Sequence, residues 1–176
     1  MVKDISLWQF GGFVFTAIGG TFLHFLYDWT KGSIFVAPFS GVNESTWEHM
    51  KLLYFPLLVF TLIQSRFFIE TENFWSIKLI GTVTGLILIP ILFYTYNGAF
   101  GKSPDYLNIA IFFICAAAAF AVENHLFKSN TFSFNMPVFS VFWIIIIGLL
   151  FVIFTFKTPE IPLFQDPLTG TYGKNR

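Results

Sequence analysis

Two histidines and several carboxylates lie within a short segment of the chain, at spacings that favour metal binding. His24 and Asp28 are four residues apart and so share one face of a helix, and Glu44 and Glu48 repeat this spacing just before His49. Neutral imidazole and carboxylate are typical ligands of Zn, Mn and Fe. We therefore predict a site for a divalent metal such as Zn. The predicted ligands are His24, Asp28, Glu44 and His49, and Glu48 is the predicted general base or a hydrogen-bond partner of the ligands.

Hydrolysis is the chemistry that such a metal site would support. A divalent metal lowers the pKa of a bound water toward about 7 and so supplies a hydroxide nucleophile, while a nearby carboxylate accepts the proton. Two other interpretations stay open. Ser45 and Glu48 fit a capping box, and an acid at Glu44 is favoured by the helix dipole, so the group could be structural. The same residues could also belong to a proton or ion pathway.

Five apolar stretches predict the helices that position these residues. Charged residues make up 11% of the chain and hydrophobic residues 55%, whereas soluble domains carry about 25% charged residues. A helix needs about 20 mainly apolar residues to cross a bilayer. The stretches of this length are approximately 8–27, 47–68, 77–96, 104–127 and 138–156. We predict an all-α integral membrane bundle of about five transmembrane helices over residues 1–156, followed by a polar C-terminal tail over 157–176.

Because the chain is predicted to cross the bilayer five times, the order of the helices decides on which side of the bilayer each polar residue lies. The first helix ends near His24 and the second begins near His49, so the predicted metal site lies on the side of the C-terminus. Glu123 lies on the other side, one bilayer thickness away, as part of an ordinary polar helix end near Lys128 or of a transport path. More Lys and Arg flank the helices on the C-terminal side, which predicts a multi-pass protein of the cell membrane with a cytoplasmic C-terminus.

The predicted partners are the lipid bilayer and other helices. Gly12, Thr16 and Gly20 are four residues apart in the first helix, and small residues at this spacing let another helix approach closely. That helix belongs either to the same chain or to a second copy in a homo-oligomer, and a membrane-protein partner is a further possibility. The formal net charge is zero, so the composition gives no basic surface for a nucleic acid.

Two resemblances rest on the segment around the predicted site. Through residues 24–29, 38–40 and 43–49, the whole chain resembles a family of small bacterial membrane proteins classed only as a domain of unknown function, which implies a membrane location. Residues 24–40 are also similar to the LexA-regulated membrane-bound metal-dependent hydrolases. Those have a His-x-x-x-Asp at a helix end, then a Thr and a Gly, and then Pro-Phe-Ser. The matching residues here are His24, Asp28, Thr30, Gly32 and Pro38-Phe39-Ser40. That family also carries an upstream histidine, whereas no histidine precedes His24 here.

Three functions fit these observations. The first is a small membrane protein without catalysis, such as a subunit or scaffold of a membrane assembly, whose polar residues satisfy one another and leave no cavity. The second is a metal-dependent hydrolase that acts on a lipid or lipid-linked substrate at the membrane interface, with its ligands converging on one metal. The third is an oligomeric transporter or ion channel with a polar path that reaches Glu123. Serine nucleophile elbows of the G-x-S-x-G type are absent from the sequence.

Overall fold

The part of the chain that the structure describes folds into five α-helices and one short 3-10 helix. The computed structural model describes residues 4–68, 70–101, 104–129 and 132–174. The elements are α1 (Ile5–Trp29), α2 (Thr46–Ser65), α3 (Phe74–Phe100), α4 (Asp105–Lys128), α5 (Pro137–Phe156) and η1 (Pro162–Phe164). Within these ranges there is no β-strand, and an isolated bridge joins Gln165 to Tyr172. The prediction of an all-α bundle is confirmed.

Four of the helices, α1, α3, α4 and α5, are long and apolar enough to cross a membrane. The fifth, α2, is more polar because its first turns hold Glu48, His49 and Lys51. Most residues of α2 are buried, and the helix contacts each of the four apolar helices. The bundle therefore consists of apolar helices, suited to lipid, that pack around a central helix whose polar side chains face protein.

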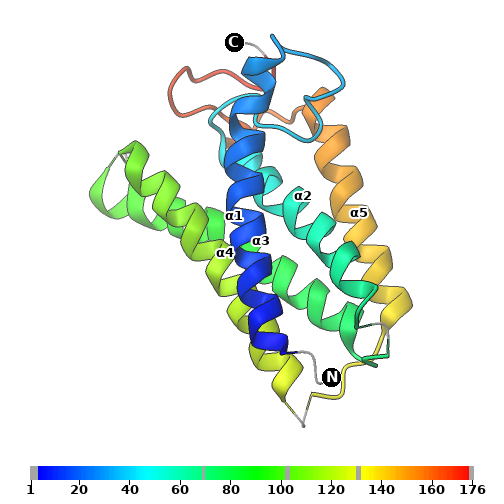
Figure 1. Cartoon of the computed structure of the whole chain (residues 1–176). Helices are drawn as coiled ribbons and strands as arrows, with labels where there is room; N and C mark the ends of the chain where they lie inside the picture. Colours follow the sequence, from blue (N-terminus) through cyan, green and yellow to red (C-terminus); the bar gives the residue numbers. More distant parts are fainter. Residues whose placement is uncertain (1–3, 69, 102–103, 130–131, 175–176) are drawn as a thin grey trace.

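The α3–α4 hairpin is inclined to the other helices. Figure 1 shows the N-terminus and the α4–α5 connection at the lower end, and the α1–α2 loop with the C-terminal segment at the upper end. In this view the hairpin end of α3 and α4 stands apart from the upper ends of α1, α2 and α5. The upper parts of α4 and of the α1–α2 pair thus diverge, at the same end of the bundle as the predicted metal site.

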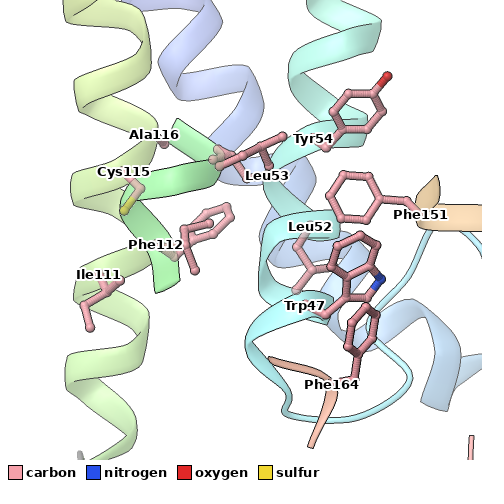
Figure 2. Packing of buried hydrophobic residues seen from close by; sticks show 12 residues of the cluster. Trp47, Leu52, Leu53, Tyr54, Ile111, Phe112, Cys115, Ala116, Phe151 and Phe164 are labelled. Atoms are coloured by element: carbon pink, nitrogen blue, oxygen red, sulfur yellow. The ribbon is translucent and has the colours of Figure 1, made fainter. Parts of the chain in front are cut away.

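Aromatic side chains join the C-terminal segment to the helical core. Trp47 of α2 lies between Phe151 of α5 and Phe164 of η1, and each of these two ring centroids is 4.6 Å from that of Trp47 (Figure 2). On the side of α2 that faces α4, the same buried cluster includes Leu52, Leu53, Phe112, Cys115 and Ala116. The residues after α5 are therefore anchored to α2, because η1 is part of the core.

The small residues of α1 are used for packing inside the chain. A Cβ added at Gly12 would lie 2.4 Å from Phe120 and 2.5 Å from Phe60, so α1 approaches α2 and α4 closely at this point. A Cβ at Gly20 would lie 2.4 Å from Phe112. Thr16, between these glycines, is fully buried. Of the two expected uses of this stripe, the structure supports the intrachain one, while an oligomeric state stays a prediction.

The loop between α1 and α2 is held against both helices. Ser40 Oγ donates to the carbonyl oxygen of Leu23 and accepts from the amide of Tyr27 at 3.0 Å. Lys51 Nζ, on α2, donates to the carbonyl oxygen of Ala37 at 2.9 Å. These contacts fold the loop back beside the last turns of α1, and they fix where its final residues enter α2.

Candidate metal centre

His24, Glu44 and His49 converge at the junction of α1, the following loop and α2. One potential ligand atom from each residue lies within 4.8 Å of the others. The Glu44 carboxylate lies between the rings, with Oε1 4.0 Å from Nε2 of His24 and Oε2 3.7 Å from Nε2 of His49. The two imidazole centroids are 6.1 Å apart. All three residues are half-buried, so the cluster is open to a small ligand.

Backbone contacts hold the ring of His49 in an orientation that suits a metal ligand. His49 Nδ1 lies 3.0 Å from the carbonyl oxygen of Ser45. When Nδ1–H donates to this oxygen, the Nε2 lone pair is free and points toward Glu44. A hydrogen bond from the second ring nitrogen to a backbone carbonyl is the usual way in which a protein orients a ligating histidine. The sequence alone gives no sign of this contact beyond the four-residue spacing from Ser45 to His49.

The backbone around Glu44 is held by the C-terminal segment on one side and by the first turn of α2 on the other. The Glu44 amide donates to Oδ2 of Asp166, in the C-terminal segment, at 3.4 Å. The next residue, Ser45, caps α2 by accepting from the amide of Glu48 at 3.4 Å, as the capping-box pattern predicts. Asn43 Oδ1 accepts from the amide of Ser45 at 2.9 Å, and Asn43 Nδ2 donates to the carbonyl oxygen of Gly173 at 2.9 Å. The C-terminal segment therefore helps to position the carboxylate over the histidines.

Asp28, the fourth predicted ligand, lies outside this cluster. It is exposed near the end of α1, about one turn or 6 Å beyond His24 along the helix axis. The loop folds back so far that the amide of Gly41 donates to the carbonyl oxygen of Leu23 at 3.4 Å. The loop therefore delivers Glu44 to the level of His24 rather than to that of Asp28. A role for Asp28 at the metal stays a prediction.

Glu48, the predicted general base, is buried in a different network. Its Oε2 lies 2.5 Å from Lys51 Nζ and accepts from the amide of Val42 at 3.0 Å. Lys51 also donates to Thr155 Oγ1 of α5 at 3.1 Å. The carboxylate thus neutralises a buried lysine and holds the end of the loop. The structure does not bring it into the cluster of His24 and Glu44, and its catalytic role stays a prediction.

A cleft of about 230 Å³ opens beside the cluster, between α1, α2 and α4. His24 and His49 line it together with Asn108 of α4, and the remaining lining is mainly apolar. Asn108 and His49 also line a smaller adjoining pocket. Sequence reasoning overlooked Asn108, although a polar residue within an apolar membrane stretch is a signal that could have identified it. The cluster therefore borders a space that opens between two membrane-spanning helices.

A second polar group lies at the opposite end of the bundle, where α4 ends (Figure 1). The Glu123 carboxylate pairs with Lys78 Nζ of α3, and Lys78 donates to Gln64 Oε1 of α2 at 3.2 Å. All three residues are fully buried. Glu123 is therefore part of an internal ion pair and not of an ordinary polar helix end near Lys128. Lys128 has a different partner, because its Nζ donates to Ser6 Oγ at 2.5 Å.

Comparison with known proteins places the chain in one family. No curated protein and no solved structure matches it. A family model covers residues 1–174, which include every residue of the candidate metal centre. The expected resemblance to a family of unknown function is thereby confirmed, while the similarity to the LexA-regulated hydrolases stays a prediction. The chain belongs to DUF6512, a family of unknown function.

Proposed function

We propose that the protein is a metal-dependent hydrolase that acts on a lipid or lipid-linked substrate at the membrane interface. In this proposal His24, Glu44 and His49 bind the divalent metal, with Zn as the first candidate. The observation that carries it is the convergence of these three ligands beside a cleft between membrane-spanning helices. Catalytic Zn sites use three protein ligands and leave a fourth position for water.

The ligand spacing is wider than Zn requires. With ligand distances of about 2.0–2.1 Å, tetrahedral geometry places neighbouring ligand atoms roughly 3.3 Å apart. The two distances from Glu44 to the histidines are 3.7 and 4.0 Å. These two distances involve different oxygens of Glu44, and one ligand atom from each of the three residues lies within 4.8 Å of the others. The half-buried side chains would therefore have to close in by up to about 1.5 Å to reach Zn spacing.

The metal would make a hydroxide from the water in the fourth position. Glu44 presents two oxygens, one toward each histidine, so one oxygen can bind the metal while the other accepts the proton from that water. The proposed acid–base residue is therefore Glu44 itself, with Glu48 as the alternative that the sequence suggested. Exposed Asp28 is the candidate for an additional ligand.

The subunit or scaffold hypothesis makes a different prediction about this region. It expects the polar residues to satisfy one another and to leave no cavity. The 230 Å³ cleft next to His24 and His49 favours the hydrolase hypothesis over it. The transporter hypothesis expects a polar path to Glu123, whereas Glu123 is engaged with buried Lys78. For these reasons the hydrolase is the function that we put forward.

We also propose that the metal centre faces the cytoplasm. Lys51 and Lys78 are both buried in ion pairs, so they do not count among the charges that flank the helices. Among the described residues, Lys31, Lys157 and Lys174 then remain at the end of the bundle with the metal centre, and Arg66 and Lys128 at the other end. This excess follows the positive-inside rule with a cytoplasmic C-terminus.

Elemental analysis of tag-free protein in mild detergent tests the metal site. Wild type is compared with His24→Ala and Glu44→Ala, and His125→Ala is the matched control because His125 is an exposed histidine of α4 outside the cluster. We expect near-stoichiometric metal in wild type and in the control, and loss of the metal in both cluster variants. Folded wild type that binds no metal even after addition of Zn or Mn would overturn the proposal and favour the subunit hypothesis.

A further inference from the structure

The cleft beside the metal centre carries an inference about the substrate. We propose that one acyl chain of a membrane lipid enters this cleft sideways from the bilayer and presents its carboxylic ester to His24, Glu44 and His49. The inference rests on the proposed function and narrows it, because it names the substrate class as an acyl ester of a membrane lipid and the reaction as deacylation.

The mouth of the cleft lies on the lipid-facing surface of two helices. Its rim is formed by Thr21 and Phe25 of α1 and by Ile109 and Phe113 of α4. All four rim residues are exposed, Ile109 by 58% and Phe25 by 45% of its surface. The floor is formed by Gly20, Leu52 and Phe112, which are buried. Because α1 and α4 are both apolar enough to cross the membrane, the medium outside this rim is the hydrocarbon of the bilayer.

The polar lining residues gather where the cleft approaches the loop end of the bundle. His24 lies near the end of α1, His49 in the first turn of α2 and Asn108 in the first turn of α4. In a membrane lipid, the ester carbonyl is the first polar group reached when one moves from the tail toward the headgroup. A chain that occupies the apolar part would therefore place its carbonyl among these three side chains.

Asn108 is suited to a second task at that position. It reaches the cleft from α4, opposite the histidines of α1 and α2. An amide donor aimed at the carbonyl oxygen stabilises the negative charge that develops when hydroxide attacks an ester. The reacting carbonyl would then lie between the metal ligands on one side and the Asn108 amide on the other.

The size and polarity of the cleft favour part of a single chain. Its volume of about 230 Å³ is below the roughly 300–1,000 Å³ of sites for drug-sized ligands, so it does not hold two chains with a headgroup. A chain that moves from the bilayer into an apolar cleft exchanges one apolar environment for another, so this step adds little affinity. The cleft therefore serves to align the chain, and the polar end of the lipid supplies most of the binding energy.

The reaction that follows is a hydrolysis with water as the co-reactant. A metal held by His24, Glu44 and His49 would activate the water, Glu44 would accept the proton of that water, and the water oxygen would form a bond to the ester carbonyl carbon. The bond between the carbonyl carbon and the alcohol oxygen then breaks, and that oxygen takes up the proton. The products are a fatty acid and a lipid with a free hydroxyl in place of the ester.

Proteoliposomes made of phosphatidylglycerol test the inference with two separate measurements. A phosphatidylglycerol with a diazirine on one acyl chain labels the residues that the chain touches, and mass spectrometry measures the released fatty acid. Ile109→Trp narrows the rim from α4 and Thr21→Phe narrows it from α1. Ile114→Trp is the matched control, because Ile114 is an exposed isoleucine of the same helix outside the cleft lining. The Zn content is measured for every variant.

We expect labelling to concentrate on the segments around Phe25 and Ile109. Either rim substitution should reduce both this labelling and fatty acid release by about tenfold or more, because a displaced chain no longer aligns the ester with the metal. The control and all Zn contents should stay unchanged. Even labelling of all lipid-facing helices, rim variants that behave like Ile114→Trp, or release of the headgroup alone would overturn the inference. Cleft labelling without Zn or hydrolysis would instead refute the proposed function.

Discussion

Replacement of Lys78 by methionine should destabilise the bundle by about 3–5 kcal/mol, because it leaves the Glu123 carboxylate buried without its cation. Both side chains have an exposed fraction of 0%. Lys78 Nζ also donates to Gln64 Oε1 at 3.2 Å and lies 5.2 Å from the ring centroid of Phe120. The change thus removes an ion pair, a hydrogen bond and a cation–π contact, of which the last is worth about 0.5–2 kcal/mol.

A double-mutant cycle shows whether the pair acts as a unit. Glu123→Leu alone should also lower the free energy of unfolding by about 3–5 kcal/mol, because it leaves the ammonium group of Lys78 without its anion. The double variant Lys78→Met/Glu123→Leu has no unpaired charge, and exchange of a buried pair for apolar residues is often neutral or stabilising. We therefore expect the double variant to lie within about 1 kcal/mol of wild type, so the single costs are far from additive.

Unfolding by titration of detergent micelles with sodium dodecyl sulfate, followed by tryptophan fluorescence, measures these free energies. Lys128→Met is the matched control, because Lys128 is an exposed lysine whose removal should cost no more than about 0.5 kcal/mol. The reasoning would be refuted if the double variant lost as much free energy of unfolding as the two single variants together. Such a result would mean that Lys78 and Glu123 contribute separately, for example through water that reaches each of them.

Three further predictions follow from the packing, the metal site and the topology. Gly12→Ala should destabilise the protein by about 1–3 kcal/mol, because the added Cβ meets Phe60 and Phe120. Gly11→Ala, with open space around the added Cβ, should instead stabilise it by about 0.5–1 kcal/mol. The same titration with sodium dodecyl sulfate measures both changes in the free energy of unfolding. Added Zn should raise the melting temperature of wild type in detergent but not that of His24→Ala, because only a state that binds metal is stabilised by it. A green fluorescent protein fused to the C-terminus should fluoresce in bacterial cells, and an alkaline phosphatase fused there should be inactive, because the proposal places the C-terminus in the cytoplasm. The reverse result would place the metal centre on the outer side of the membrane.

The apolar stretches were sufficient to predict the helices, because each is long enough to cross a bilayer and its ends carry polar or turn residues. The sequence also brought His24, Glu44 and His49 to one side, since a single loop joins α1 to α2. The sequence could not show that Asp28 lies outside the cluster of the other predicted ligands. The reason is that the loop folds back at Gly41 through tertiary contacts of its backbone.

Pairs that are distant in the sequence were harder to predict. Lys78 and Glu123 are 45 residues apart, and neither residue type nor spacing indicates that α3 and α4 bring them together. The cleft depends on how the α3–α4 hairpin diverges from α1 and α2, which is a property of helix packing and not of any one segment (Figure 1). Glu48 and Lys51 are only three residues apart on α2, but their burial depends on contacts with the loop at Ala37 and with Thr155 of α5, so the spacing alone did not predict it.

The role of Glu48 is the point at which the sequence and the structure suggest different chemistry. As a general base it would accept a proton from water at the metal. In the structure it pairs with Lys51 and accepts from the amide of Val42, two residues before the loop delivers Glu44. A positioning role therefore explains its location: Glu48 neutralises Lys51, Lys51 holds the loop at Ala37, and the loop places Glu44.

Two variants separate these roles. Glu48→Gln keeps the shape of the side chain but leaves the charge of buried Lys51 unpaired, so we expect lower stability and weaker Zn binding together. Glu48→Gln/Lys51→Met removes both charges and should regain stability. If Glu48 acts only by positioning Glu44, Zn content and hydrolysis should stay low together, because the loop has lost the hydrogen bond from Lys51 to Ala37. If instead both variants keep their Zn and both lose about 10²–10⁴-fold in hydrolysis, Glu48 is the proton acceptor itself, because only the proton transfer has then been removed.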